Sequence, residues 1–223
     1  MSIIEQFNSL SPFLVFWSLL FGISYSLEKN FAWRKSSFRL TTPVLNLLET
    51  FILQSFGLLF ILSSLLFPET VNEGIVAILL RSTIAFYFVE SLFQLFSRTV
   101  NLGMIAHHLV GIFGASMMLI NPSFYFESCI LLMLTKISFQ HSVQLLFRYF
   151  EWKAPVFLRV NAWWNLFTFS LCRGLLIPVW TLYTLIHGIL PLSLLIPLLM
   201  LIIWGLVFIP KVEQNTSRFL NKA

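Results

Sequence analysis

The stretch LGMIAHHLVGIFGASMMLI, residues 102–120, decides how this chain folds. It is almost wholly apolar and close to the length of about 20 residues that a helix needs to cross the hydrocarbon core of a bilayer. Its first half nevertheless carries two adjacent histidines, His107 and His108. An imidazole inside hydrocarbon is costly and is a functional-site hypothesis by default. The stretch therefore predicts a membrane-spanning helix that contributes to a polar site.

The composition of the whole chain agrees with a membrane protein. Of the 223 residues, 58% are hydrophobic and 10% are charged, whereas soluble domains carry about 25% charged residues. The net charge of +5 does not indicate a nucleic-acid partner, because the basic residues flank apolar stretches and form no continuous basic face. All nine acidic residues are glutamates.

Six further apolar stretches of similar length are separated by charged, proline, glycine or asparagine residues. An open sheet leaves backbone groups unpaired in lipid, and the alternating pattern of barrel strands is absent, so every stretch is expected to be a helix. The predicted fold class is an all-α membrane protein, a bundle of seven transmembrane helices. It comprises an N-terminal span with a basic loop (1–43), a six-span region (44–209) and a short tail (210–223). The spans are expected at 12–27, 44–67, 75–96, 102–120, 128–147, 160–186 and 189–209.

The basic residues predict the orientation of this bundle. Eleven of the fourteen lysines and arginines fall in the odd-numbered loops and the tail, and none falls in the N-terminal segment or the even-numbered loops. Cytoplasmic loops carry an excess of Lys and Arg. The N-terminus is therefore expected to be lumenal or outside and the tail to be cytoplasmic. The eleven are Lys29, Arg34, Lys35, Arg39, Arg98, Arg148, Lys153, Arg159, Lys211, Arg218 and Lys222.

Polar side chains from five spans are expected to lie at one depth. At a helical rise of about 1.5 Å per residue, each is about 8–9 Å from the cytoplasmic end of its span. Ionisable groups inside a membrane are rare and face the interior of a bundle, so we predict a polar pocket on the cytoplasmic side. The residues of this layer are Glu49, Glu90, His107, His108, His141 and Asn165.

Two cations, Lys136 and Arg173, are expected closer to the middle of the membrane. A guanidinium there needs an anion, backbone carbonyls or water, and we expect both residues to help bind a substrate. Other polar residues in the spans are better explained as interhelical hydrogen bonders. These are Asn46, Gln54, Ser63 and Ser64.

The third and fourth spans predict the geometry of the histidine pair. A short loop joins these spans, so they are expected to be antiparallel neighbours, with Glu90 opposite His107 and His108. Consecutive helical residues differ by about 100° around the axis, so only one imidazole can point at Glu90. The other is expected to face the cavity or the next span, where His141 lies.

Several other chemistries lack the residues that they require. Four histidines are too few for a di-iron site, and the chain has no HExxH motif, no Cys-His zinc spacing, no GxSxG and no P-loop. We therefore expect no metal and no bound cofactor.

Beyond the second span, the chain resembles the TLC domain that ceramide synthases, TRAM and several lipid-homeostasis proteins share. The resemblance is carried by 87–92 (YFVESL), 105–109 (IAHHL), 134–139 (LTKISF), 167–178 (FTFSLCRGLLIP) and Trp204. Because the chain has no aspartate for the paired aspartates of ceramide synthases, it is more similar to the smaller members outside that group. The resemblance implies an endoplasmic-reticulum or related membrane and a function in lipid metabolism.

Two functions remain open from the sequence. The first is an acyltransferase in which His107, His108 and Glu90 are catalytic and acyl-CoA is a co-substrate. Lys136, Arg173, His141, Glu49 and Asn165 would then bind the substrate. The second is a non-catalytic protein of membrane composition or trafficking that binds lipids in the same pocket. Both give membrane lipids as the partners, and the sequence leaves the oligomeric state open.

Overall fold

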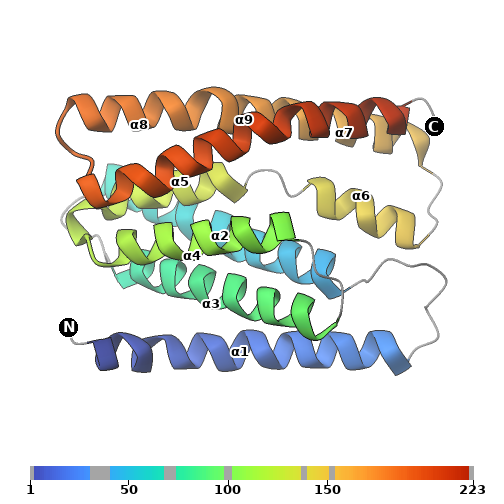
Figure 1. Ribbon diagram of the computed structural model, residues 1–223, viewed down its shortest axis with the longest axis horizontal. Helices are drawn as coiled ribbons and strands as arrows, with labels where there is room; N and C mark the ends of the chain where they lie inside the picture. Colours follow the sequence, from blue (N-terminus) through green and yellow to red (C-terminus); the bar gives the residue numbers. More distant parts are fainter. Residues whose placement is uncertain are drawn as a thin grey trace.

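The computed structural model of the chain describes residues 3–30, 41–67, 74–97, 102–136, 140–150 and 154–220. Within these ranges all regular structure is helical, as the sequence predicts. Figure 1 shows the helices running side by side along the long axis of one bundle. They are α1 (Ile3–Asn30), α2 (Thr41–Leu66), α3 (Gly74–Phe96), α4 (Leu102–Leu119), η2 (Pro122–Phe124), α5 (Tyr125–Lys136), α6 (Gln140–Tyr149), α7 (Pro155–Phe169), η3 (Ser170–Leu176), α8 (Ile177–Ile186) and α9 (Leu192–Leu220).

Six helical segments of the described ranges are long and apolar enough to cross a membrane. Their outer faces expose large apolar side chains, such as Phe51 at 71% and Leu19 at 59%. Soluble monomers rarely expose wide apolar patches, so these faces belong in lipid. The chain is an integral, multi-pass membrane protein. The six segments are Ser9–Lys29, Thr41–Leu66, Gly74–Phe96, Leu102–Leu119, Pro155–Ile186 and Leu192–Gln214.

The expected span at 128–147 differs from the others. The structure has two helices there, α5 and α6, and residues 137–139 between them lie outside the described ranges. With 12 and 10 residues, neither helix alone covers a hydrocarbon core of about 30 Å at a rise of about 1.5 Å per residue. In Figure 1 the two helices follow one another along the long axis of the bundle. Two half-length helices thus occupy the place of one expected continuous helix.

The last helix is longer than the sequence predicts. α9 continues from residue 209, the expected end of the last span, to Leu220, so most of the expected tail belongs to this helix. Pro197 and Pro210 lie inside α9. A membrane helix tolerates proline where neighbouring groups satisfy the backbone carbonyl that the proline leaves unpaired.

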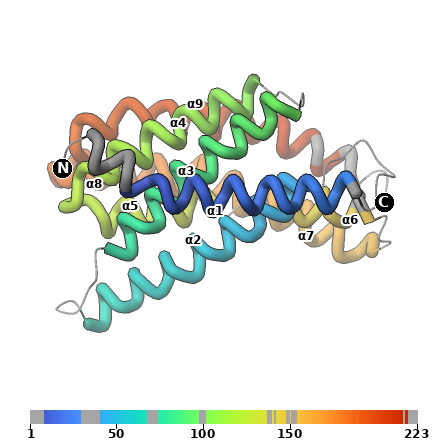
Figure 2. The backbone as a smooth tube through the Cα atoms, turned by 90° about the horizontal axis from the view of Figure 1, so that it is seen from below, coloured from blue at the N-terminus to red at the C-terminus, as the bar shows by residue number. Residues whose placement is uncertain are grey.

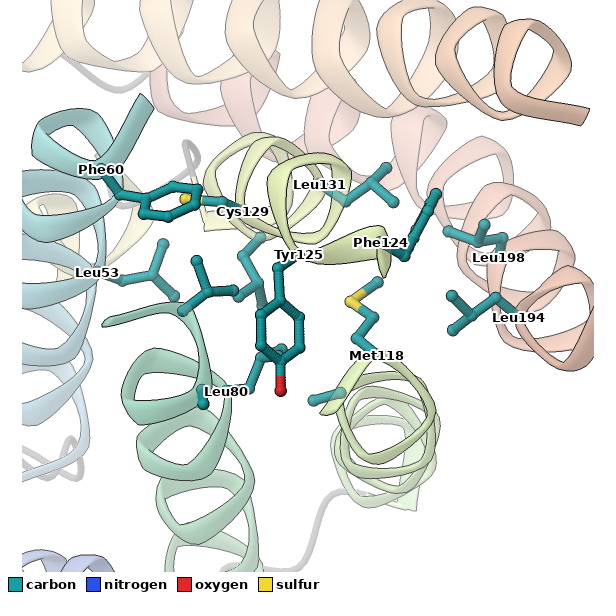
Figure 3. Close-up of a cluster of buried hydrophobic side chains, with 14 of the residues drawn as sticks. Leu53, Phe60, Leu80, Met118, Phe124, Tyr125, Cys129, Leu131, Leu194 and Leu198 are labelled. Carbon is teal, nitrogen blue, oxygen red and sulfur yellow. The ribbon is translucent and has the colours of Figure 1, made fainter. Parts of the chain in front are cut away.

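One end of the bundle is filled by an apolar core. Figure 3 shows Tyr125 extending from α5 among side chains that include Leu80 and Met118, with Phe60 beside Cys129. The Tyr125 hydroxyl donates to the Leu119 carbonyl oxygen at 3.0 Å, so its one polar group is satisfied. Close packing of this kind is stabilising because each buried side chain keeps many dispersion contacts.

A second apolar cluster attaches α1 to the rest of the bundle. Trp17 is fully buried against Phe86 of α3, with the ring centroids 4.8 Å apart in an edge-on arrangement. The Trp17 indole Nε1 donates to Ser82 Oγ at 3.1 Å. Figure 2 shows α1 crossing in front of α3 and the far end of α2 diverging from its neighbours. These contacts position α3, which supplies the polar site described next.

Candidate functional site

A polar cavity of about 440 Å³ lies at the other end of the bundle, where the charge pattern predicts the cytoplasm. The predicted site residues His107, His108, Lys136, Asn165 and Arg173 all line it, although they come from α4, α5, α7 and η3. Helix α9 forms another wall through Trp204, Phe208, Lys211, Val212 and Thr216, which are residues of one helical face.

Two predicted residues, Glu49 and Glu90, are buried behind this lining, at 2% and 1% exposure. Each contacts a residue of the cavity wall and not the cavity itself. His141 belongs to α6, but its side chain lies outside the described residues. The structure thus brings together five of the eight predicted side chains around one space and places two others directly behind them.

His108 has a polar neighbour at each ring nitrogen. Its Nε2 lies 3.4 Å from Glu90 Oε2, and its Nδ1 lies 3.0 Å from Ser91 Oγ. The Ser91 hydroxyl donates its only proton to the Tyr87 carbonyl oxygen at 2.8 Å, so it accepts from His108 Nδ1–H. Nε2 is then the proton-free nitrogen of a neutral ring, and a bond to Glu90 requires one further proton between them. Glu90 Oε2 has no hydrogen-bond partner among the described residues, so His108 and Glu90 are buried neighbours at 3.4 Å without a hydrogen bond between them.

His107 is the more accessible of the two histidines. It lines the cavity and is only partly buried, whereas His108 is 1% exposed. Its ring stacks on Trp204 of α9 at a centroid distance of 5.8 Å and meets Tyr87 edge-on at 6.1 Å. The geometry confirms the expectation that one imidazole faces Glu90 while the other faces the cavity. A bound molecule would meet His107 first.

Lys136 is paired inside the bundle. Its Nζ lies 2.8 Å from Glu49 Oε2 and 4.2 Å from the centre of the Tyr87 ring. Thr83 Oγ1 donates to the other Glu49 oxygen at 3.3 Å. A buried charge is tolerated when it is paired and hydrogen-bonded, and both conditions hold here. The lysine ammonium is therefore neutralised by Glu49 before any ligand enters.

Tyr87 joins the two ionic pairs. Its ring lies under Lys136 Nζ on one side and stacks on His108 at 4.9 Å and 15°. A glycine at position 111 makes this arrangement possible, since a Cβ there would come within 2.5 Å of Tyr87 Cε2. Tyr87, Ser91 and Gly111 are not among the predicted site residues, although Tyr87 and Ser91 flank Glu90 and lie in the stretch that carries the TLC resemblance.

Arg173 is placed by an unusual turn of helix. η3 is a π-helix, a wide turn found frequently at functional sites, and it links α7 to α8 without a break. Arg173 is 6% exposed, and its Nη2 donates to the Thr135 carbonyl oxygen at 2.8 Å. Gly205 allows α9 to approach, because a Cβ there would lie 2.9 Å from Arg173 Cβ.

Two further polar residues, Gln54 and Asn46, form hydrogen bonds between helices. Gln54 Nε2 donates to the Met133 carbonyl oxygen at 2.8 Å, beside the Arg173 bond to Thr135. Gln54 is therefore an interhelical hydrogen bonder, as predicted. Asn46 also bonds across helices, because its Nδ2 donates to Glu90 Oε1 at 3.3 Å.

An apolar slot of about 60 Å³ adjoins the polar cavity and shares Tyr87, His107 and Thr135 with it. It leads away from the polar end, between α4 and α9, towards Met118 and Leu194. The site therefore has a polar part and an apolar part that meet at His107. Among the described residues, no group of three His, Cys, Asp or Glu side chains has the arrangement of a metal site.

No protein-family model, curated protein or solved structure matches this chain.

Proposed function

We propose that this chain handles lipids inside a membrane and holds them in the cavity that opens towards the cytoplasm. One observation carries the proposal: a polar cavity with imidazole, ammonium and guanidinium groups continues into an apolar slot between helices. Ligand sites in helix bundles lie between helices and combine apolar walls with a few polar groups. A molecule with a polar head and an apolar chain fits this division, as a TLC-like function implies.

The acyltransferase form of the proposal assigns a different task to each histidine. His107, which faces the cavity, would take a proton from a hydroxyl or amine as that group attacks an acyl carbonyl. His108 and Glu90 would act behind it. They would hold a proton in reserve and fix the position of α4, which carries His107. Acyl-CoA would supply the acyl group: the thioester bond breaks as the new ester or amide bond forms, and the proton held by His107 passes to the departing CoA thiolate.

The second candidate is a lipid-binding protein without catalysis, and a separate observation favours it. His108 bonds Ser91 and lies against Glu90, and Lys136 is paired with Glu49, so most of the titratable groups already have a polar neighbour. Such pairing stabilises a fixed pocket and does not require chemistry.

A comparison of histidine variants distinguishes the two forms. The full chain is purified in a mild detergent, and its copurifying lipids are identified by mass spectrometry. His107→Ala should slow turnover of that lipid class by about 10²–10⁴-fold if His107 is a general base. A binding role predicts a graded loss of lipid occupancy instead. His187→Ala is the matched control, because His187 is exposed and its side-chain contacts among the described residues are with Tyr183, one helical turn earlier. No copurifying lipid in the wild-type protein would contradict the proposal.

The orientation belongs to the same proposal and has its own test. We propose that α5 and α6 together form one discontinuous crossing, which gives seven crossings and a cytoplasmic tail. Asn215-Thr216-Ser217 is an N-glycosylation pattern that this orientation leaves unmodified. Expression in a eukaryotic cell, followed by a glycosidase mobility-shift assay, checks this. A glycan on Asn215 would invert the orientation and move the polar cavity to the lumenal side.

A further inference from the structure

The two buried cations of the cavity wall differ in how their charge is balanced. Lys136 contacts Glu49 at 2.8 Å, and His108 contacts Glu90 at 3.4 Å. No described carboxylate lies within ion-pair distance of Arg173. Its ring contact, with Phe169 at 5.3 Å, and its bond to the Thr135 carbonyl leave the net positive charge in place. Arg173 therefore retains an uncompensated charge at the cavity wall.

The hydrogen bonds of Arg173 are also incomplete. A guanidinium carries five N–H donors, and a described acceptor takes one of them, at Nη2. Its Nε and Nη1 are buried and have no hydrogen-bond partner among the described residues. A buried donor without a partner costs free energy, and a buried charge without a counter-charge costs more. A ligand that supplies both an acceptor and a negative charge removes both costs.

We infer that Arg173 binds the oxyanion of a lipid head, a carboxylate or a phosphate, with the adjoining apolar part of the lipid entering the slot beside His107. This rests on the proposed function and adds the charge of the substrate class. A planar guanidinium binds the paired oxygens of a carboxylate or phosphate with two parallel bonds. Lys211 lines the same cavity and adds a further positive charge to its wall.

The position of the slot indicates that the oxyanion belongs to a molecule with an apolar part. Thr135 lines both the cavity and the slot, and its carbonyl is bonded to Arg173. An anion held by Arg173 thus has the apolar slot next to it, walled by residues such as Gly114 and Leu198. A free inorganic anion would leave that slot unused, whereas the apolar part of a lipid nearest to its anionic head would enter it.

Four ligands separate these alternatives for the full chain purified in dodecyl maltoside, with binding measured by native mass spectrometry. Oleate and dioleoyl phosphatidic acid present the two oxyanions on acyl chains, oleyl alcohol presents a chain without charge, and inorganic phosphate presents an anion without a chain. The wild-type protein should bind at least one of the two anionic lipids more tightly than oleyl alcohol, and inorganic phosphate should not displace it. Displacement by inorganic phosphate would overturn the assignment to a lipid.

Arg173→Gln removes the charge and keeps an N–H donor for the Thr135 carbonyl. It should weaken binding of the anionic lipid by about tenfold to a hundredfold, the worth of a charge-assisted hydrogen bond, and leave oleyl alcohol unaffected. Arg81→Gln is the matched control, because Arg81 is a cation of α3 that does not line the cavity. Unchanged affinity of Arg173→Gln for the anionic lipid would overturn the inference.

A failure of this inference is distinguishable from a failure of the proposed function. If the wild type binds oleyl alcohol as tightly as it binds oleate and phosphatidic acid, the lipid site stands and the oxyanion assignment is wrong. If it retains none of the three lipids, both fail. Should Arg173→Gln not fold, Arg173→Lys keeps the charge and a donor but loses the planar fork. It should then bind the anionic lipid more weakly than wild type, and equal binding would contradict a two-bond clamp.

Discussion

The two ends of the bundle use the same helices but are packed in different ways. At one end α3 contributes Leu80 and α4 contributes Met118 to a core of apolar side chains. At the other end α4 contributes His108 to the wall of a cavity of about 440 Å³, and α3 contributes Glu90 directly behind it. Apolar side chains interdigitate freely, whereas paired charges must keep fixed distances and directions. The apolar end therefore stabilises the fold, and the polar end leaves the space that a ligand can fill.

The largest expected effect tests the buried charges of the polar end. Glu49→Gln keeps an acceptor for Thr83 but leaves the Lys136 ammonium without a counter-charge. Loss of one partner of a buried pair destabilises by roughly 3–5 kcal/mol. We expect this loss in the free energy of unfolding, measured by denaturant titration in detergent micelles.

The double variant Glu49→Leu with Lys136→Met is the control for this prediction. Because it removes both charges, it should recover most of the lost stability. If Glu49→Gln alone is as stable as wild type, water or another group neutralises Lys136, and the two ends are less different than the structure indicates.

The second prediction concerns the apolar end. Leu80 is fully buried in the core, and Leu80→Ala leaves a cavity there. Such truncations cost roughly 2–4 kcal/mol, and we expect a lower unfolding free energy by that amount. Lipid occupancy of the folded protein should stay unchanged, because Leu80 does not line the cavity or the slot. A loss of bound lipid at a temperature where the variant is folded would show that the ends are coupled.

The difference between the ends also explains what the sequence could predict. Hydropathy and the basic residues predict helices, and six of the seven expected spans are long apolar helices in the structure. The depth of each polar residue follows from helical rise, so the grouping of His107, His108 and Asn165 was within reach. The bounds of α5 and α6 within the expected span at 128–147 could not be predicted, because hydropathy measures how apolar a stretch is and not where each helix begins and ends.

The sequence also could not predict which charged residues pair across helices. Depth alone did not reveal that Lys136 pairs with Glu49 while Arg173 has no described carboxylate, because pairing depends on how each helix is rotated about its axis. The contacts of Ser91 and Tyr87 with His108 also depend on these rotations, so they could not be predicted either. The role of Gly111 could have been predicted in part, since a glycine within a helix next to a predicted site often permits close approach of another group. That this group is Tyr87 is known only from the structure.

The third prediction tests how tightly the polar end is built. Gly111→Ala places a methyl group against Tyr87, whose ring is enclosed by His108 and Lys136 and has little room to move. Overpacking of this kind costs roughly 1–3 kcal/mol, and we expect thermal unfolding in detergent to show it. Gly22→Ala is the matched control, because no atom lies within 4 Å of a Cβ at that position of α1. Equal melting temperatures of the two variants would mean that Tyr87 and its neighbours can shift to make room for the added methyl group.

The smallest expected effect concerns one hydroxyl at each end. Ser91→Ala removes the acceptor of His108 Nδ1–H, whereas Ser64→Ala removes only a bond to the Phe60 carbonyl in its own helix. Ser91→Ala should lower the unfolding free energy by about 1 kcal/mol, and Ser64→Ala should have almost no effect, since its carbonyl acceptor is already bonded within the helix. The histidine tautomer gives a sharper readout. In protein labelled with ¹⁵N-histidine, the signals that disappear in His108→Ala identify His108, and wild type should show the proton on Nδ1. Ser91→Ala should shift that proton towards Nε2, where Glu90 can accept it. An unchanged tautomer would mean that Glu90 and the stacking of Tyr87 hold the ring without Ser91.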